Sequence, residues 1–343
     1  MRPIWSASTT VAGSQVRKSP STMCLLQDFA SGSPPNKSWA SEWISKSTPR
    51  SGWRGFVVEM AYSGRDSRRL QPQVPPVTDA ETTSLNHRFG GVARLYGQAA
   101  LDRFLTARVA VIGVGGVGSW AVESLARSGI GHITMVDLDE ICITNVNRQL
   151  HAMDGQIGRQ KTEAMADRAL AIHPECEVVI IPKFFNEKSA TEILDAGFDA
   201  VIDAIDYARH KSLLVAECHR REIYAVTCGG AGGRRDPTRI RVTDLAYSGM
   251  DPLLLQLRRG LRNDYGFPKT PRNQDPVLFG IDAVYSDEAP YYSHCDGTVS
   301  KTAPEEIAMR LNCASGFGSA THIIGSFGLI AAGRVLENIA ARA

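Results

Sequence analysis

The stretch from residue 108 to residue 126 constrains the fold of this chain more than any other. Residues 108–112 form an apolar, β-branched run, which indicates a buried strand of a parallel sheet. The run ends in the pattern Gly113-x-Gly115-x-x-Gly118, after which apolar side chains recur at helical spacing. On such a turn, Gly113 permits a tight bend, Gly115 lets a phosphate approach the backbone, and Gly118 lets the helix pack on the strand. Because a helix start also favours an anion, the pattern predicts a nucleotide site, without indicating which nucleotide.

The residues that follow supply the second half of the same unit. Residues 131–136 are predicted to form the next strand, and Asp137 stands at its carboxyl end. At this distance from the glycines, the carboxylate of an acidic residue can accept hydrogen bonds from ribose hydroxyls. The alternative is an aspartate that only caps a loop. The strand, the glycines and the acid follow one another at the spacing of a nucleotide-binding unit, which favours ribose binding.

Beyond this unit, predicted strands and helices alternate along the chain. Helices are expected over residues 98–107, 161–172, 188–196, 208–221 and 319–340, and strands over 177–181, 198–206, 223–228 and 239–244. The alternation predicts an α/β fold, namely a doubly wound, Rossmann-like, mostly parallel sheet with helices on both faces. We expect residues 86–343 to form this domain.

Residues 1–85 differ from the rest of the chain. Ser, Pro, Arg and Trp recur there without helical or strand periodicity, and acidic residues are scarce. Such a segment resembles an organelle transit sequence. Alternatively, it is an upstream extension outside the folded protein, with Met60 as the genuine start, and we favour this second interpretation. It lacks the apolar core of a secretory signal, and we expect it to be disordered.

Two further segments have a distinctive composition. Residues 264–292 are poor in periodic signal and rich in Pro, Asp and Gly, so we expect a long mobile segment that serves as a lid or linker. The last predicted helix is apolar over nearly a membrane-spanning length, but it contains His322 and several glycines. We therefore expect it to pack against the sheet or a second subunit and not to enter a membrane.

Composition excludes few classes of function. A net charge of +2 over 343 residues argues neither for nor against a nucleic-acid partner. The seven cysteines are scattered, and no two of them form a CxxC pair. This usage indicates a reducing compartment, which we take to be the cytoplasm. It argues against a disulfide framework and against a four-cysteine zinc site.

A set of polar residues helps to decide between nucleotides. Asp137, the loop 145–149, Lys161 and Asp206 should converge beside the glycine turn, at the carboxyl ends of the strands. Arg148 and Lys161 can neutralise phosphate charge there and Asp206 can hold Mg²⁺, which suits a triphosphate better than a nicotinamide cofactor. Taken singly, Arg148 can be a solvated cation, Lys161 an ordinary helix-start lysine, and Asp206 a helix cap.

Five short motifs carry a family resemblance. They are Gly113-x-Gly-Gly-x-Gly118, Asp137-x-Asp139, Thr144-Asn145-x-x-Arg148-Gln149, Gly158-x-x-Lys161 and Asp203-x-x-Asp206. Together they resemble the adenylating superfamily of ubiquitin-activating, molybdopterin-synthase-activating and thiamine-thiocarboxylate enzymes. Within it, residues 88–97, 145–149, 228–233 and 313–318 resemble the tRNA threonylcarbamoyladenosine dehydratase branch.

The resemblance implies a homodimeric enzyme that uses ATP and Mg²⁺ to cyclise threonylcarbamoyladenosine in tRNA. It implies nucleotide contacts from Gly113, Gly115, Gly116, Gly118, Asp137, Asp139, Asn145, Asn147, Arg148, Gln149 and Lys161. It also implies catalytic roles for Arg148, Lys161 and Asp206, with Asp206 as the magnesium ligand. A sulfur-transfer protein is a further implied partner.

Some assignments stay open. The arginine that sulfur-carrier-activating relatives supply in trans aligns with Gly91, so Arg88 or Arg94 would replace it. Because ring closure can use a nucleophile on the substrate itself, a catalytic cysteine is optional, and Cys228 and Cys313 are the candidates.

Three other functions compete with the tRNA reaction. They are adenylation of a ubiquitin-like or sulfur-carrier protein, hydride transfer by a nicotinamide dehydrogenase, and a non-catalytic nucleotide-binding scaffold. The enzymes that activate sulfur carriers have paired CxxC zinc ligands, which this chain lacks. A cluster of arginines is either part of a tRNA footprint or a solvated face: Arg234, Arg235, Arg258, Arg259 and Arg262.

Overall fold

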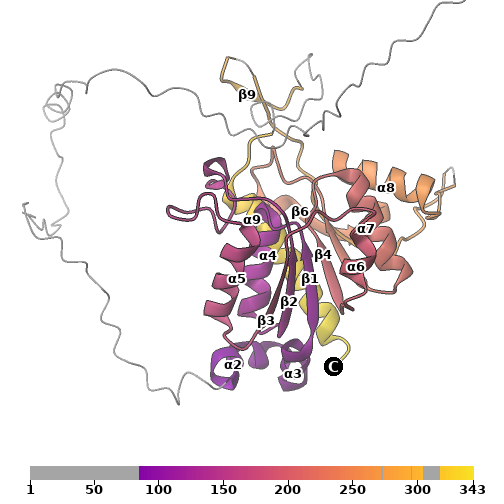
Figure 1. Cartoon of the computed structure of the whole chain (residues 1–343). Helices are drawn as coiled ribbons and strands as arrows, with labels where there is room; N and C mark the ends of the chain where they lie inside the picture. The colour runs from indigo at the N-terminus through magenta and orange to yellow at the C-terminus, as the bar shows by residue number, and fades with distance from the viewer. Residues whose placement is uncertain (1–84, 272, 295, 304–316) are drawn as a thin grey trace, which may run out of the picture. The chain divides into compact units, whose positions relative to one another are not determined.

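The computed structural model describes residues 85–271, 273–294, 296–303 and 317–343. Except for Leu85, the predicted N-terminal extension lies outside these residues, and so do Met60 and Cys313. The described chain opens with the helices α2 (Leu85–Tyr96) and α3 (Gln98–Thr106), which lie at the amino ends of the central strands (Figure 1).

Seven strands of the described chain form one sheet in the order β3-β2-β1-β4-β5-β7-β6. They are β1 (Arg108–Ile112), β2 (His132–Val136), β3 (Glu177–Ile181), β4 (Ala200–Asp203), β5 (Tyr224–Cys228), β6 (Ile240–Asp244) and β7 (Asp282–Ser286). Neighbouring strands are parallel except for β6 and β7. The strand order reverses between β1 and β4, which is where doubly wound folds bind ligands. The predicted fold class is confirmed.

Helices cover both faces of the sheet because successive strand residues point to opposite faces. Val109 and Val111 belong to the core under α4 (Gly116–Arg127), α5 (Lys161–Ile172) and α9 (Thr321–Ala340). Ala110 and Ile112 belong to the core under α6 (Ala190–Leu194), α7 (Ala208–Arg220) and α8 (Pro252–Asp264). The two groups of helices stand on either side of the strands in Figure 1.

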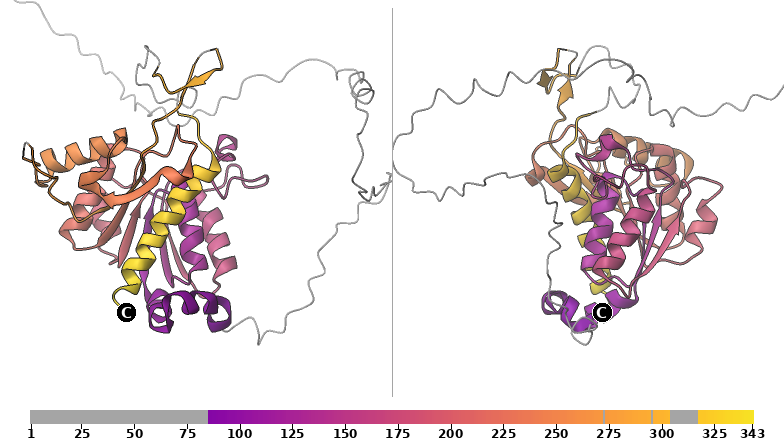
Figure 2. Two further views of the ribbon diagram at one scale, coloured as in Figure 1. Left: turned by 180° about the vertical axis from the view of Figure 1, so that it is seen from behind. Right: turned by 60° about the vertical axis from the view of Figure 1, so that its left-hand side comes forward.

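Helix α9 runs along the sheet beside α4 (Figure 2). Two glycines allow this close approach, since an ideal Cβ on Gly328 would lie 2.3 Å from the Val117 carbonyl oxygen and one on Gly325 would lie 3.3 Å from the Trp120 ring. By length and composition α9 could span a membrane, but 56% of its apolar window is buried inside the protein. The expectation that this helix packs against the sheet is confirmed.

The expectation of one long irregular segment at residues 264–292 is wrong for its later part. Strand β7 lies there and pairs with β5 and β6. Four of its five residues are buried, so it lacks the alternation of apolar and polar side chains that marks a half-exposed strand. Helix α8, capped by Asp251, was not predicted either, and β4 ends at Asp203 instead of Asp206. A short hairpin of β8 (Tyr292–Ser293) and β9 (Val299–Ser300) follows β7.

Candidate functional site

The turn between β1 and α4 has the geometry predicted from its glycines. Gly113 has a φ of +90°, a left-handed conformation that glycine adopts without strain. An ideal Cβ on Gly118 would lie 1.8 Å from the Gly113 carbonyl oxygen, so only glycine lets the helix come this close. A Cβ on Gly115 would make only an ordinary contact, at 3.8 Å. A Cβ on Gly116 would lie 2.5 Å from the Ile324 side chain of α9, so this glycine has a packing role that was not predicted.

Asp137 lies directly after β2, and its buried carboxylate holds the glycine turn in place. Its Oδ2 accepts a hydrogen bond from the Val114 N–H at 2.7 Å, and its Oδ1 accepts one from the Asp139 N–H at 2.8 Å. Burial raises the pKa of this carboxyl group, while the Lys161 cation and the two N–H groups oppose the rise. Each carboxylate oxygen can accept a further hydrogen bond, so ribose binding by Asp137 stays compatible with these contacts.

Lys161 opens α5 and points back toward the strand ends. Its Nζ lies 2.7 Å from Oδ2 of Asp139, and its side chain is only 8% exposed. The Lys161 N–H also donates to the Asp139 carbonyl oxygen at 3.0 Å. Burial, together with the Lys161 cation, lowers the pKa of nearby His151 to about 4, so this imidazole is neutral near pH 7. The structure thus joins two predicted site residues, Asp139 and Lys161, in one ion pair.

Asn145 and Gln149 are the buried residues of the predicted phosphate loop. Asn145 Oδ1 accepts a hydrogen bond from the Cys142 N–H at 3.0 Å, and Gln149 Oε1 lies 3.1 Å from Nε2 of His151. Both side chains are therefore engaged within the protein. Their contacts shape the loop and present its outward residues.

Asn147 and Arg148 are the polar residues of this loop that are exposed or half-buried. Asn147 Nδ2 donates to the Ser319 carbonyl oxygen at 2.9 Å, which ties the loop to the start of α9. Arg148 Nη1 donates to the Thr144 carbonyl oxygen at 2.7 Å and to Asn147 Oδ1 at 3.0 Å. A Cβ on Gly116 would lie 3.7 Å from Cγ of Arg148, so this arginine lies beside the glycine turn. Within the described residues, no carboxylate pairs with its guanidinium group.

Asp206 lies in the loop between β4 and α7, and its side chain is exposed. Helix α7 begins after Tyr207 without a side-chain cap, so the structure does not support the capping role considered for Asp206. In the part of the chain that the structure describes, Asp206 makes no hydrogen bond or ion pair. The loop itself touches the glycine turn, because a Cβ on Gly113 would lie 2.9 Å from the Ala204 carbonyl oxygen.

Asp203 and Lys211 form a buried ion pair that was not predicted. Lys211 Nζ lies 2.7 Å from Asp203 Oδ2, and both side chains are fully buried. A signal for it does exist in the sequence, since a lysine stands in the first turns of a helix that directly follows a strand ending in an aspartate.

Of the two candidate cysteines, Cys228 is unsuited to nucleophilic attack. It is buried at the end of β5, and burial raises the pKa of its thiol to about 12. The thiolate is the nucleophile, so a thiol with this pKa is unreactive near pH 7. Cys313 lies outside the described residues.

Arg88 and Arg94 both belong to α2, far from the glycine turn of the same subunit. Arg88 Nη1 donates at 2.8 Å to the carbonyl oxygen of Ile172, the last residue of α5. Lys161 is the first of the twelve residues of that helix, and a helix rises by roughly 1.5 Å per residue. Arg88 therefore lies at the opposite end of α5 from Lys161, and Arg94 lies in the last turn of α2.

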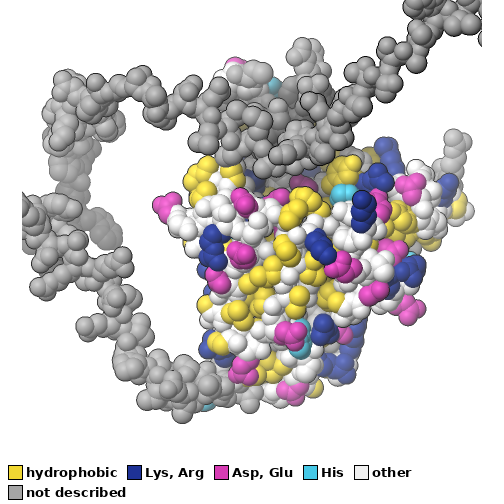
Figure 3. Space-filling model, viewed as in Figure 1, with side chains coloured by type: hydrophobic (Ala, Val, Ile, Leu, Met, Phe, Trp, Pro, Cys, Tyr) yellow, Lys and Arg dark blue, Asp and Glu magenta, His cyan; other side chains and the backbone are white. Residues whose placement is uncertain are grey.

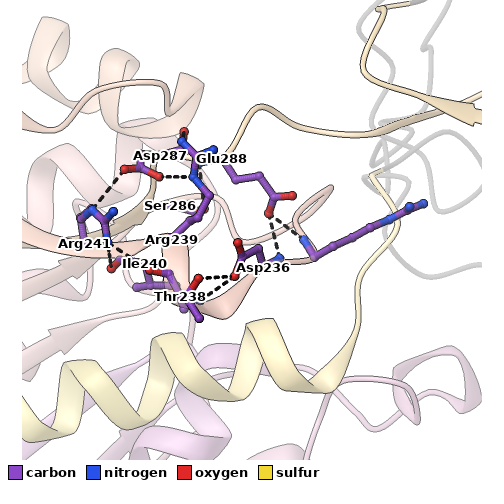
Figure 4. Close-up of polar contacts among 9 residues, drawn as sticks. Asp236, Thr238, Arg239, Ile240, Arg241, Ser286, Asp287 and Glu288 are labelled. Carbon is purple, nitrogen blue, oxygen red and sulfur yellow. Dashed lines mark hydrogen bonds and ion pairs between the residues drawn. The ribbon is translucent and has the colours of Figure 1, made fainter.

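Charged pairs hold the segment that follows the turn at residues 229–233 (Figure 4). Glu288, which is buried, accepts a hydrogen bond from the Asp236 N–H at 3.0 Å. Asp287 pairs with Arg239 at 2.6 Å. These contacts anchor the chain beyond β5 to the residues that follow β7.

The arginines considered for a tRNA footprint do not form one solvated face. Arg234 is 4% exposed, and its Nη2 donates to the Met250 carbonyl oxygen at 3.2 Å. The Arg262 guanidinium group lies 5.1 Å from the centre of the Phe279 ring. Arg235, in contrast, is exposed.

Comparisons with known proteins extend over most of the described fold. Residues 91–336 match the model of the ThiF family. The chain is 47% identical over 257 residues to a tRNA threonylcarbamoyladenosine dehydratase of Escherichia coli K12, covering 75% of this chain and 94% of that protein. It is 29% identical over 163 residues to a molybdopterin-synthase adenylyltransferase of Salmonella typhimurium, covering 48% of this chain and 62% of that protein.

A solved structure agrees with these sequence matches. The crystal structure of E. coli tRNA N6-threonylcarbamoyladenosine dehydratase in complex with ATP superposes with a TM-score of 0.66 at 41% identity, covering 76% of this chain and 97% of that one. The resemblance inferred from the motifs is confirmed. The chain therefore belongs to the ThiF family, and within that family it is similar to the tRNA threonylcarbamoyladenosine dehydratases.

Proposed function

We propose that this chain uses ATP to cyclise threonylcarbamoyladenosine in tRNA, through an acyl-adenylate of the substrate's carboxylate. The observation that carries the proposal is the 47% identity to a tRNA threonylcarbamoyladenosine dehydratase over 94% of that relative. A similar protein of known structure binds ATP, which favours ATP over a nicotinamide cofactor. The match to a molybdopterin-synthase adenylyltransferase covers only 48% of this chain, which favours the tRNA reaction over activation of a carrier protein.

The geometry of the strand ends supports a distinct role for each predicted residue. The turn formed by Gly113, Gly115, Gly116 and Gly118 takes the phosphates at the start of α4, where N–H groups and the helix dipole favour an anion. Asp137 and Asp139 receive the ribose, while Asn147, Arg148 and Lys161 face the phosphates. Lys161 can do so by exchanging Asp139 for a phosphate oxygen, because the ion-paired Asp139 side chain is 53% exposed. Asn145 and Gln149 contribute by shaping the loop.

Asp206 suits the role of a magnesium ligand. Mg²⁺ takes hard oxygen ligands, usually one or two carboxylates together with substrate phosphates. Asp206 offers an exposed carboxylate that has no protein partner among the described residues. Those residues also contain no group of three or more His, Cys, Asp or Glu side chains that could hold a metal ion without the substrate. When bound, Mg²⁺ would shield the negative charge of the triphosphate.

The proposed reaction has two bond exchanges. First, a carboxylate oxygen of the substrate bonds to the α-phosphorus of ATP, and the bond from that phosphorus to the β-phosphate oxygen breaks, which releases pyrophosphate. Arg148 and Lys161 supply positive charge where negative charge develops. Second, a nucleophilic atom of the same modified base attacks the acyl carbon, loses its proton, and displaces AMP as the ring closes. Because both groups belong to one nucleoside, the step needs no protein nucleophile.

We further propose a homodimer that acts in the cytoplasm. Support for a dimer comes from apolar side chains exposed in the segment that follows β2, close to the site: Leu138, Ile143, Val146, Met153 and Ile157. Support for a reducing compartment comes from Cys176, Cys218 and Cys228, which are buried thiols.

On the described part of the face in Figure 3, basic and acidic side chains are interspersed, so a tRNA would find no uniform basic patch there. A sulfur-transfer partner stays a prediction.

The test is incubation of the protein with ATP, Mg²⁺ and bulk tRNA that carries threonylcarbamoyladenosine, followed by mass spectrometry of the nucleosides. We expect the modified nucleoside to lose the mass of one water, with release of AMP and pyrophosphate in equal amounts. A carrier protein that ends in Gly-Gly serves as the competing substrate. Adenylation of that protein without any change in the tRNA would contradict the proposal.

A further inference from the structure

A network of polar side chains is sealed beneath the loop that carries Asp206. Lys211 Nζ donates to Asp203 Oδ2 at 2.7 Å, to Thr227 Oγ1 at 3.2 Å and to the Asp203 carbonyl oxygen at 3.3 Å. Thr227 Oγ1 in turn donates to the same Asp203 Oδ2 at 2.7 Å. All three side chains are fully buried, and the three protons of the ammonium group each have an acceptor.

Such a network needs a reason beyond holding the fold together. Moving two charges out of water has a large desolvation free energy, and replacing a buried ion pair with well-packed apolar residues is often neutral or stabilising. A buried ion pair is therefore weak evidence for a role in stability. Burial raises the pKa of the Asp203 carboxyl group, and Lys211 is the largest of the effects that oppose this rise. Lys211 and Thr227 both donate to Asp203 Oδ2, so the network fixes the orientation of this carboxyl group.

The other oxygen of Asp203 reaches the site. Asp203 Oδ1 accepts a hydrogen bond from the Ile205 N–H at 3.2 Å, and so fixes the first residues of the loop between β4 and α7. The Ala204 N–H donates to the Ile112 carbonyl oxygen at 2.9 Å, and the Ala204 carbonyl oxygen lies against Gly113. The network thus sets one loop that both touches the glycine turn and carries Asp206.

We propose that Lys211 is a positioning residue, which acts through Asp203 to hold the loop 204–207 so that Asp206 faces the phosphates bound at the glycine turn. Lys211 itself is sealed from the site and touches no substrate. The inference rests on the proposed function, because Asp206 must be the magnesium ligand for its position to matter. Changes to residues that orient a metal ligand typically lower metal affinity or activity by about 10-fold to 100-fold.

Two variants weaken the network to different degrees. Lys211→Met removes the ammonium group while keeping most of the side-chain volume. Thr227→Val removes one hydrogen bond to Asp203 without changing a charge, and it serves as the milder variant if Lys211→Met does not fold. For either variant, we expect the Ile205 amide to exchange its hydrogen faster, and we expect the half-saturating Mg²⁺ concentration for AMP release to rise by about 10-fold or more for Lys211→Met.

Glu123→Gln is the matched control, since it weakens a different buried carboxylate, which pairs with Arg168 at 2.5 Å between α4 and α5. It should lower the melting temperature without changing the Mg²⁺ dependence. Asp206→Ala is measured beside it to separate two kinds of failure. If Asp206→Ala is inactive while both network variants keep normal amide exchange and Mg²⁺ dependence, the positioning role is refuted and the proposed function stands. If Asp206→Ala keeps the Mg²⁺ dependence of the parent, Asp206 is not the magnesium ligand and the positioning role is refuted. The proposed function falls only if the parent protein itself fails to remove water from the tRNA nucleoside.

Discussion

Replacing Arg148 with alanine should remove most of the activity and little of the stability. The side chain makes two hydrogen bonds at the protein surface, to the Thr144 carbonyl oxygen at 2.7 Å and to Asn147 Oδ1 at 3.0 Å. A hydrogen bond contributes about 0.5–1.5 kcal/mol to stability, so the loss of two should lower the free energy of unfolding by roughly 1–3 kcal/mol at most. In contrast, losing one donor aimed at developing negative charge costs about 10²–10³ in rate, which is ~2.7–4 kcal/mol of transition-state stabilisation.

The assay is the rate of AMP release with purified tRNA that carries threonylcarbamoyladenosine, at saturating ATP and Mg²⁺, with thermal unfolding of each variant in parallel. Arg159→Ala is the matched control, because Arg159 also makes surface contacts, to Asp167 and Gln156, each at 2.8 Å. It should lose similar stability and keep its turnover. Arg148→Lys should recover part of the rate, since it retains the charge but not the planar guanidinium group.

The reasoning about Arg148 fails if Arg148→Ala turns over within a few-fold of the parent protein. In that case the guanidinium group does not face the transferring phosphate, and its two hydrogen bonds to the loop are its whole contribution. It also fails if Arg159→Ala loses as much activity as Arg148→Ala at equal stability. The loss would then come from removing any surface arginine in the segment between β2 and α5, and not from a specific contact of Arg148.

Four other changes have expected outcomes. Gly118→Ala should lower the melting temperature and weaken ATP binding in calorimetry, because its Cβ would lie 1.8 Å from a backbone oxygen; unchanged binding would refute this. His151, with a pKa lowered to about 4 from 6.5, takes up its proton more readily in the unfolded chain, so stability should be lost as the pH falls from 6.5 toward 4. The contribution of His151 is about 3 kcal/mol at most, and His151→Gln should reduce the loss by that amount in urea unfolding at several pH values. Cys228→Ala should keep turnover within a few-fold, and an inactive but folded variant would restore Cys228 as a nucleophile. A chain that starts at Met60 should melt and turn over like the full chain, and a large loss of stability would contradict the expected N-terminal extension.

Features that depend on neighbouring residues were predictable from the sequence alone. The run of residues 108–112, the glycines after it and the helical spacing beyond them together specify a strand, a turn and a helix, because each signal lies within a few residues. The same holds for Asp137, whose place at the end of a strand follows from the apolar run before it. The family resemblance likewise rests on short motifs with fixed spacing.

Features that depend on distant partners were decided only by the tertiary structure. Strand β7 is a strand because β5 and β6 supply its hydrogen bonds and helices bury both of its faces, and its five residues carry no such information by themselves. Gly116 needs to be a glycine because α9, more than 200 residues later in the chain, packs against it. Asp203 and Lys211 can be buried because folding brings each within hydrogen-bonding distance of the other and of Thr227. The local sequence predicts the position of a residue within its own helix or strand. Desolvation and close contact of its side chain arise only when separate elements pack together.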